Sequence, residues 1–358
     1  MAFLEFKNVR IAGVAAGVPR FAASNLHPLE DDGISKDYSP EAFVETTGVL
    51  ERRISNNLTT SDLCFEAAEQ LITDLKWDRS EIEALIFVSQ TADYILPATA
   101  CILQDRLGLS KECYAEDIAL GCSGWVYGLS TIASLLSSGT IRKALLLVGD
   151  AKKRARGPRD PLFGHAGTAT AVEFHEGVDS LKFHFGTDGS GYDAIITPDG
   201  GSRNQVSPDS FKLEDVDGKR LHRLQTRMKG MDVFSFGIST APKSVKRLAE
   251  RFGFDYLDYD YYVFHQANMK MNSLISKKLK LDPNKVPSCM YSFGNTSSAS
   301  IPLTIVTQLK NRCENGSKFI CCGFGVGLSW GTVAFISDGL VVSELVEVDD
   351  YKENRQWV

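Results

Sequence analysis

The apolar residues of the chain follow two periods, one typical of buried strands and one typical of amphipathic helices. Residues 84–89 and 145–150 are near-continuous apolar runs, as in parallel strands that are covered on both faces. Residues 63–75 carry apolar side chains at helical spacing, and Thr60 or Ser61 is the expected N-cap of this helix. Strands buried on both faces need helices on both sides, so the pattern favours an α/β fold built in layers.

Turn and cap residues mark further elements. Residues 9–17 predict a first strand, and residues 113–120 predict a short buried strand. Ser39 followed by Pro40 predicts the start of a short helix. The least regular stretch, residues 199–230, is polar and charged and predicts a surface excursion.

The second half of the chain repeats the order of elements in the first. An apolar strand, an amphipathic helix, a glycine-marked turn and a helix of small residues occur twice at similar spacing. We therefore predict a duplication, with an N-terminal half at residues 1–185 and a C-terminal half at residues 186–358. The repeat places Cys122 and Asn295 at equivalent positions in two halves that face each other.

Composition and charge narrow the class of protein. The chain has 358 residues, 43% of them hydrophobic and 23% charged, which suits a globular protein with a sizeable core. A net charge of −6 gives no reason to expect nucleic acid or an anionic membrane as a partner. No apolar run approaches the ~18 residues of a membrane span, and no signal peptide is predicted.

The eight cysteines lie mostly in apolar runs and show no paired spacing for a metal. Cys321 and Cys322 are adjacent in a strand-like run, where successive side chains face opposite ways. This usage predicts free thiols in a reducing cytoplasm, and no metal site.

One cysteine stands out by its neighbours. Cys122 lies between Gly121 and Ser123, where a strand is expected to run into a buried helix. Unpaired N–H groups and the helix dipole favour an anion at such a point, so the thiolate is expected to be stabilised. The alternative is that Cys122 is a small core residue, which is the commoner role of a free cysteine.

Two further polar residues occupy suitable positions. His265 follows an apolar strand, at the end where α/β sites form, and is either a site residue or a histidine that caps the strand. Asn295 is either a site residue or a turn residue or helix cap. Residues 323–331 are glycine-rich but lack a Walker lysine and a dinucleotide spacing. We expect these glycines to let a backbone N–H approach a reacting oxygen.

Together these segments resemble the 3-oxoacyl-(acyl-carrier-protein) synthase III family. The matches are Gly-Cys-Ser-Gly around Cys122, His-Gln-Ala-Asn from His265, Gly-Asn-Thr-Ser-Ser-Ala-Ser-Ile-Pro around Asn295, and the tail at residues 323–331. Two further segments look like the family, at residues 47–54 and 188–191. The resemblance spans almost the whole chain in the right order. It implies the thiolase fold, in which two duplicated α/β halves form five αβαβα layers, and a homodimer.

The resemblance also implies a role for each site residue. Cys122 is the nucleophile that takes an acyl group from a thioester, and the N–H groups of Cys122 and Val326 bind the oxyanion. The family more often has glycine at the position of Val326. His265 and Asn295 act as neutral donors to the malonyl thioester carbonyl while carbon dioxide leaves, and Phe324 shields the leaving carboxylate from water. No metal or redox cofactor is required, since coenzyme A or carrier-protein thioesters are substrates.

One family feature is missing. The coenzyme A site of well-known members has a Trp–Ile–Val–x–Arg pattern, whereas residues 42–46 here read Ala-Phe-Val-Glu-Thr. Coenzyme A therefore binds differently, or a protein carries the acyl donor. A basic loop is equally a source of phosphate contacts or a solvated surface, and its arginines are Arg154, Arg156 and Arg159.

Partner surfaces are implied at two places. Lys270, Lys277 and Lys278 follow the His-Gln-Ala-Asn motif on a predicted helix, and family members bind acidic acyl carrier protein with basic residues here. Residues 94–97 correspond to the loop that limits acyl length from the dimer partner. Their content does not name a chain length.

The leading interpretation is a decarboxylating condensation of an acyl group on Cys122 with malonyl-acyl carrier protein, in fatty acid or related acyl-chain biosynthesis. The alternative is a relative that passes the acyl group to an oxygen or nitrogen acceptor in secondary-metabolite or polysaccharide biosynthesis. Asn295 favours condensation, because an ester-forming enzyme has less need of it. A cysteine hydrolase conflicts with the repeat. A non-catalytic scaffold conflicts with three intact polar positions.

Overall fold

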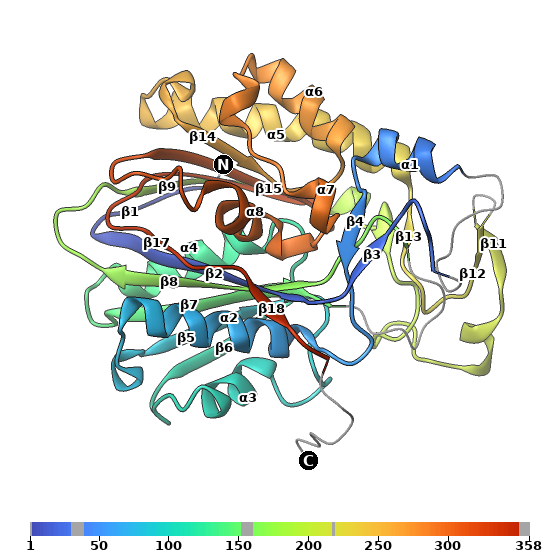
Figure 1. The fold of residues 1–358 in the computed structure, drawn as a ribbon, viewed down its shortest axis with the longest axis horizontal. Coiled ribbons are helices and arrows are strands. Elements are labelled where there is room, and N and C mark those ends of the chain that lie inside the picture. Colours follow the sequence, from blue (N-terminus) through green and yellow to red (C-terminus); the bar gives the residue numbers. More distant parts are fainter. Residues whose placement is uncertain (1, 30–38, 152–159, 217–218, 351–358) are drawn as a thin grey trace.

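Two mixed β-sheets build the protein in the computed structural model, in which residues 2–29, 39–151, 160–216 and 219–350 are described (Figure 1). The first sheet has the order β17 (Val341–Val342), β2 (Val9–Pro19), β8 (Ala166–Phe174), β7 (Lys143–Asp150), β5 (Ala84–Val88) and β6 (Tyr114–Ile118), with β18 (Val346–Val348) also paired to β2. The second has the order β1 (Ala2–Phe6), β9 (Leu181–Thr187), β16 (Ser329–Ile336), β15 (Lys318–Gly325) and β14 (Tyr261–Phe264).

The two sheets share one topology. In the first, β5 is parallel to β7, which is antiparallel to β8, which is antiparallel to β2. In the second, β14 is parallel to β15, followed by antiparallel β16 and β9. The duplicated α/β fold is therefore confirmed, and the apolar runs at residues 84–89 and 145–150 are the buried parallel strands that their pattern predicted.

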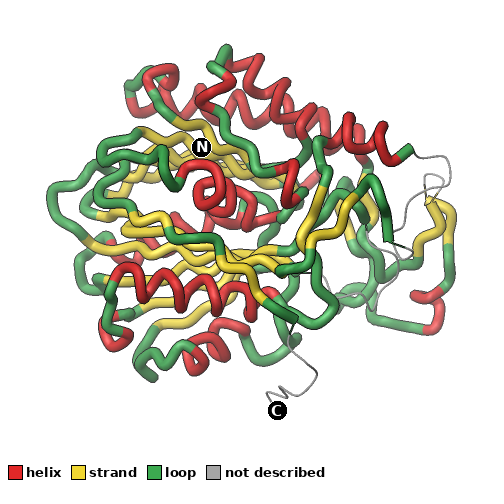
Figure 2. The backbone as a smooth tube through the Cα atoms, viewed as in Figure 1, coloured by secondary structure: helices red, strands yellow, loops and turns green. Residues whose placement is uncertain are grey.

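Helices complete five layers. α2 (Thr60–Leu75) and α3 (Thr99–Arg106) cover the first sheet, α4 (Gly124–Leu136) and α8 (Ser300–Leu309) lie between the sheets, and α5 (Gly230–Phe252) and α6 (Met269–Leu279) cover the second (Figure 1). Figure 2 shows the same alternation of helix and strand layers. The main core lies around α4 and α8, because these two helices face both sheets.

Two local predictions need correction. The N-cap of α2 is Thr59, because its hydroxyl accepts the Asp62 N–H while the Asp62 side chain accepts the Thr59 N–H. The strand predicted to be buried at residues 113–120 is β6, and its side chains are exposed or half-buried. β6 is the edge of the first sheet, so one side of its backbone has no neighbouring strand within the described chain.

The two ends of the chain cross between the halves. β1 comes from the N-terminus but pairs with β9 of the second sheet. β17 and β18 come from the C-terminal region but pair with β2 of the first sheet. Each sheet thus borrows an edge from the other half of the chain. The division at residue 185 stays a prediction.

The remaining elements gather beside the layers (Figure 1). They are α1 (Pro40–Thr47), α7 (Met290–Phe293) and the strand pairs β3 (Ala22–Ser24)–β4 (Glu51–Arg53), β10 (Ile195–Ile196)–β13 (Arg227–Met228) and β11 (Glu214–Val216)–β12 (Lys219–Leu221). Within the described residues, the excursion predicted at 199–230 is ordered by ion pairs, among them Arg223–Asp199 and Arg227–Glu214. None of the helices in the described part of the chain is long and apolar enough to cross a membrane.

Candidate active site

Cys122 lies between the end of β6 and the start of α4, two residues before the first helical residue. Its side chain is half-buried. The end of β15 packs directly against it, because a Cβ placed on Gly325 would lie 2.7 Å from Sγ, and one on Gly323 would lie 2.8 Å from the Cys122 carbonyl oxygen. Glycines at both positions therefore let the strand backbone lie directly against Cys122, and the predicted approach of a backbone N–H to a reacting oxygen stays a prediction.

The electrostatics of Cys122 differ from the prediction. Burial raises the pKa of the thiol, while hydrogen bonds with the Val326 backbone, the Cys122 backbone and the Ser297 side chain oppose this rise. The sequence prediction considered only the helix N-terminus, which stabilises a thiolate, and not the free energy needed to remove a thiolate from water. The pKa of the free Cys122 thiol is therefore higher than the sequence predicted.

His265 follows β14 directly, and only 2% of it is exposed. Its backbone N–H donates to the Cys322 carbonyl at 2.9 Å, which extends the β14–β15 pairing by one residue. Nδ1 lies 2.8 Å from the Ser300 hydroxyl oxygen. Burial lowers the pKa of His265 to about 4, so the imidazole is neutral at physiological pH.

Asn295 stands in the turn between α7 and the short 3-10 helix η6 (Ser297–Ala299). Its backbone N–H donates to the Leu162 carbonyl, and its carbonyl accepts from the Gly164 N–H. The side-chain Oδ1 accepts the Ser297 N–H at 2.9 Å, which orients the amide so that Nδ2 remains a donor. That Nδ2 makes a long 3.5 Å contact with the carbonyl of Ala267, which belongs to the His-Gln-Ala-Asn motif.

Ser297 connects the three predicted residues, although the sequence analysis did not single it out. Its N–H donates to Asn295 Oδ1 at 2.9 Å, its side chain helps to lower the pKa of the Cys122 thiol, and its backbone helps to raise the pKa of His265. Its φ of +53° is unusual for a residue other than glycine and marks a strained position. The structure therefore brings the three residues together, with elements from both halves contributing.

The aromatic and backbone groups of β15 surround this cluster. The Phe324 ring is buried and stands edge-on to His265, with ring centroids 5.7 Å apart and planes at 83°. The Val326 backbone opposes the effect of burial by lowering the pKa of the Cys122 thiol. The Val326 carbonyl accepts from the Ser329 hydroxyl, which also contacts the Ser123 hydroxyl at 2.7 Å. Strand β15 thus faces both the thiol and the imidazole.

Comparisons with known proteins identify the family of the chain. Two models of the 3-oxoacyl-(acyl-carrier-protein) synthase III family match, one at residues 116–189 and its C-terminal model at residues 249–336. The beta-ketoacyl-(acyl-carrier-protein) synthase III of Clostridioides difficile is 33% identical over 328 residues, or 90% of this chain and 96% of that protein. This chain belongs to the 3-oxoacyl-(acyl-carrier-protein) synthase III family.

Solved structures show the same relationship. A 3-oxoacyl-(acyl-carrier protein) synthase from Burkholderia xenovorans is 37% identical, with a TM-score of 0.89 over 97% of this chain and 99% of that one. The 3-oxoacyl-(acyl carrier protein) synthase III of Pseudomonas aeruginosa is 28% identical, with a TM-score of 0.79 over 93% and 99%. The family resemblance inferred from the motifs is thereby confirmed.

The basic residues expected on the synthase III helix are not equivalent. Lys270 and Lys277 are exposed on α6, seven residues apart on one face. The Lys278 ammonium donates to the Ile238 carbonyl of α5 at 2.9 Å, so part of its role is to join the two helices. Arg154, Arg156 and Arg159 lie outside the described residues.

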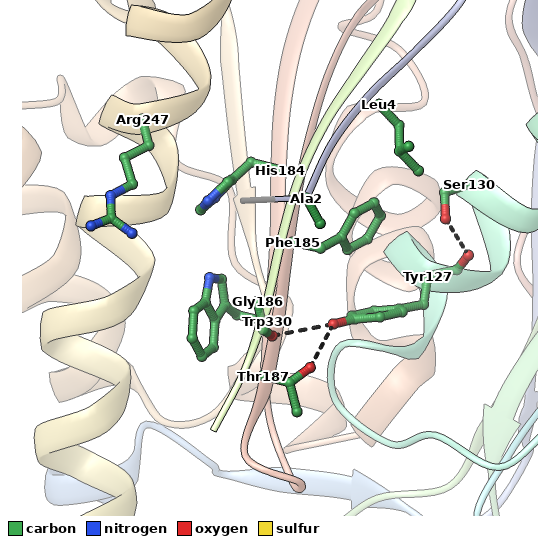
Figure 3. A pocket seen from close by; sticks show the side chains of 10 residues that line it. All are labelled: Ala2, Leu4, Tyr127, Ser130, His184, Phe185, Gly186, Thr187, Arg247 and Trp330. Carbon is green, nitrogen blue, oxygen red and sulfur yellow. Dashed lines mark hydrogen bonds between the residues drawn. The ribbon is translucent and has the colours of Figure 1, made fainter. Parts of the chain in front are cut away.

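A cavity of about 580 Å³ lies away from these residues, beside the start of β1, and none of the predicted site residues lines it. Arg247 of α5, His184 of β9 and Tyr127 of α4 are among its lining side chains (Figure 3). Among the described residues, no group of three or more His, Cys, Asp or Glu side chains is arranged to hold a metal ion.

Proposed function

We propose that this synthase III family member condenses a thioester-derived acyl group, carried on Cys122, with malonyl-acyl carrier protein to give a 3-oxoacyl product. The observation that supports this most strongly is Ser297, whose contacts tie the thiol, the imidazole and the amide into one cluster. A nucleophile beside two neutral donors suits acyl transfer followed by decarboxylation.

Acyl transfer comes first in the proposed reaction. The Cys122 sulfur attacks the thioester carbonyl, and the donor's thiol leaves with the proton. The tetrahedral oxyanion is held by backbone N–H groups of Cys122 and Val326, which already face the thiol as hydrogen-bonding groups. Because burial raises the pKa of the free thiol, the resting thiol is expected to be protonated and to lose its proton as it attacks the thioester carbonyl.

Decarboxylation and carbon–carbon bond formation follow. His265 and Asn295 donate hydrogen bonds to the malonyl thioester oxygen as carbon dioxide leaves, so the negative charge of the enolate develops against two donors. Its carbon attacks the acyl-Cys122 carbonyl, and the sulfur leaves as the 3-oxoacyl product forms. A neutral imidazole suits this role, and the pKa of about 4 keeps it neutral. The edge-on Phe324 ring keeps water from the departing carboxylate.

Substrate delivery uses the outer surface of the second half. Lys270 and Lys277 are the ammonium groups proposed to dock the acidic acyl carrier protein. The positions that would stack adenine and bind phosphate in well-known relatives are Ala42 and Thr46, both exposed on α1. The acyl donor is therefore either an acyl-coenzyme A that binds in another way or an acylated carrier protein. Both donors are tested in the assay below.

A homodimer completes the proposal. The edge strand β6 has no neighbouring strand in the described chain, and Ile95 and Leu96 are 97% and 83% exposed. Such edges and apolar side chains are usually covered by a partner. Sedimentation of the wild-type protein and of Ile95→Asp tests this point. A single species at monomer mass for the wild type would contradict the dimer.

The experiment on function is an intact-mass assay. The protein is incubated with acyl-coenzyme A or acyl carrier protein donors, and Cys122→Ala should lose the acyl adduct. Cys101→Ala is the matched control, because Cys101 is an exposed free thiol outside the site and its loss should change nothing. Malonyl-acyl carrier protein should then yield carbon dioxide and a 3-oxoacyl product.

The outcomes separate the alternatives. No adduct from any thioester would contradict acyl transfer through Cys122. An adduct that is passed to an alcohol or amine without release of carbon dioxide would favour the oxygen- or nitrogen-acylating relative. The Asn295→Ala variant should form the adduct and lose decarboxylation. A cytoplasmic location and a role in fatty acid synthesis stay part of the proposal.

A further inference from the structure

A buried carboxylate lies where the two halves meet. Asp150 is the last residue of β7 and only 5% of it is exposed. Its Oδ1 accepts hydrogen bonds from the Ser89 hydroxyl at 3.1 Å, the Gln90 N–H at 2.9 Å and the Thr91 hydroxyl at 3.2 Å. All three donors belong to the loop after β5. One carboxylate oxygen therefore organises the loop that ends the neighbouring strand.

The other oxygen of Asp150 reaches the opposite half. Its Oδ2 accepts from the Ser298 hydroxyl at 3.4 Å. Ser298 is 1% exposed and lies in η6, immediately after Ser297. A single carboxylate thus holds the loop after β5 with one oxygen and the turn after Asn295 with the other.

Both contacted segments lead to reacting groups. A Cβ on Gly121 would lie 2.5 Å from the Gln90 side-chain oxygen, so Gln90 packs against the backbone next to Cys122. Ser298 follows the residue that contacts Cys122, His265 and Asn295. A shift of either segment would therefore change the distance between the thiol and the two donors.

The charge of Asp150 acts at the same place. Burial is the largest cause of the raised pKa of Cys122, and the Coulombic effect of Asp150 adds to it. Asp150 is the one charged side chain among the causes identified for that thiol in the described chain, and the nearby His265 is neutral. The carboxylate therefore opposes a permanent thiolate while it fixes the surrounding geometry.

We propose that Asp150 is a positioning residue of this site. It fixes the loop after β5, which packs next to Cys122, relative to the turn that follows Asn295, and it places a negative charge near Cys122. The inference rests on the proposed condensation, since it assigns Asp150 to the residues that carry out its two steps. Asp150 acts on the site through its hydrogen bonds with Gln90 and Ser298 and through its charge.

Two variants separate the charge from the connection. Asp150→Asn keeps an oxygen for the three donors on the loop after β5, and its new amide N–H can donate to the Ser298 hydroxyl oxygen. It removes the charge with little change of shape. Ser298→Ala keeps the charge and removes the hydrogen bond that Asp150 Oδ2 accepts from the Ser298 hydroxyl of the opposite half. Glu173→Gln is the control, because Glu173 pairs with Arg10 and lies opposite Lys143, at the far end of β7 from Asp150.

The first measurement is the pH dependence of Cys122 alkylation by iodoacetamide, followed by mass mapping of the peptide that carries residue 122. Asp150→Asn should move the midpoint to lower pH by about half a unit or more, because removing a nearby negative charge favours the thiolate. Ser298→Ala and Glu173→Gln should leave the midpoint unchanged. A residue with a purely structural role would not move the midpoint in this direction.

The second measurement follows the two half-reactions. In Ser298→Ala, acylation of Cys122 should stay within about twofold of wild type, and carbon dioxide release from malonyl-acyl carrier protein should fall at least about fivefold. Glu173→Gln should match the wild type in both. Thermal unfolding of each variant identifies any that has lost its fold, and Ser298→Ala then tests the connection alone.

The possible results decide the question. An unchanged alkylation midpoint in Asp150→Asn, or wild-type decarboxylation in Ser298→Ala, would overturn the assignment. Failure of the proposed function gives a different result, because the wild type itself would then form no acyl adduct and release no carbon dioxide. Alkylation needs no substrate, so its midpoints would still decide whether Asp150 acts on Cys122.

Discussion

Gly325 and Cys122 lie so close that a Cβ on residue 325 would come 2.7 Å from the cysteine sulfur, well inside van der Waals contact. Gly325→Ala must therefore displace either the end of β15 or the thiol. We expect condensation to fall by at least about a hundredfold, since misplacement of about 1 Å has large effects on positioned reactants. Steady-state kinetics and the rate of Cys122 acylation provide the measurement.

A control for this glycine exists on the surface. A Cβ on Gly201 would meet no atom within 4 Å, and its φ is ordinary. Gly201→Ala should therefore retain wild-type rates. Equal activity of Gly325→Ala and Gly201→Ala would show that β15 does not constrain the thiol.

A second prediction concerns Ser300 and the proton on His265. The Ser300 oxygen accepts the Gln266 N–H at 3.3 Å, which favours donation of its own proton to Nδ1 of His265. The ring proton then sits on Nε2, which is the donor that decarboxylation needs. Ser300→Ala should lower carbon dioxide release about tenfold and populate both tautomers, as measured by nitrogen NMR of the imidazole.

Ser244→Ala is the matched control, because the Ser244 hydroxyl lies 2.8 Å from Nδ1 of another buried histidine, His184. Both variants remove one buried serine–histidine hydrogen bond. Similar losses of stability with different effects on decarboxylation would support the tautomer role. If Ser300→Ala and Ser244→Ala released carbon dioxide at the same rate, Ser300 would stabilise the fold without selecting the His265 tautomer.

A third prediction concerns acid stability. Burial lowers the pKa of His184 and of His265 to about 4, against an ordinary value of 6.5. Between about pH 6.5 and pH 4, the unfolded chain therefore binds protons at these two histidines and the folded protein does not. The free energy of unfolding keeps their full contribution above about pH 6.5 and loses it progressively down to about pH 4. Each histidine should contribute about 3 kcal/mol to this loss.

Urea unfolding at pH 7.5 and at pH 4.5 measures the effect. The two histidines together cause this loss of stability between pH 7.5 and pH 4.5. His184→Gln should remove roughly half of it. His175→Gln is the control, because His175 is exposed. An unchanged pH dependence in His184→Gln would show that His184 is not held neutral by the fold.

A fourth prediction concerns the carrier-protein surface. Lys270→Glu and Lys277→Glu should each raise KM for malonyl-acyl carrier protein about fivefold or more at low salt with kcat nearly unchanged, and the effect should shrink as salt is added. Lys111→Glu is the control, since Lys111 is exposed and follows α3 in the chain. Helix α3 lies at the opposite end of the layers from α6 (Figure 1). If neither Lys270→Glu nor Lys277→Glu changed KM, the α6 face would be excluded as the surface that binds acyl carrier protein.

Local patterns predicted the parts of the fold that depend on neighbours in sequence. The runs at residues 84–89 and 145–150 are buried strands, as their near-continuous apolar composition predicted. The cap of α2 was misplaced by one residue because Thr59, Thr60 and Ser61 are all suitable, and the reciprocal bond to Asp62 decides among them.

The rest depended on contacts between distant segments. The edge position of β6 follows from sheet order, which the apolar pattern does not reveal. Ser297 and Asp150 were not recognised because serine and aspartate are common near turns, and their roles come from the opposite half. The raised pKa of Cys122 reflects burial by β15, about 200 residues away in the chain.

The crossing of the chain ends has a consequence for synthesis of the protein. β2 is synthesised long before its outer neighbours β17 and β18. During translation the first sheet therefore keeps an open edge, where wrong strands can pair, until residues 341–348 have been made. β1 likewise has no partner until β9 has been made. A chain cut short before residue 341 would therefore carry an uncovered β2.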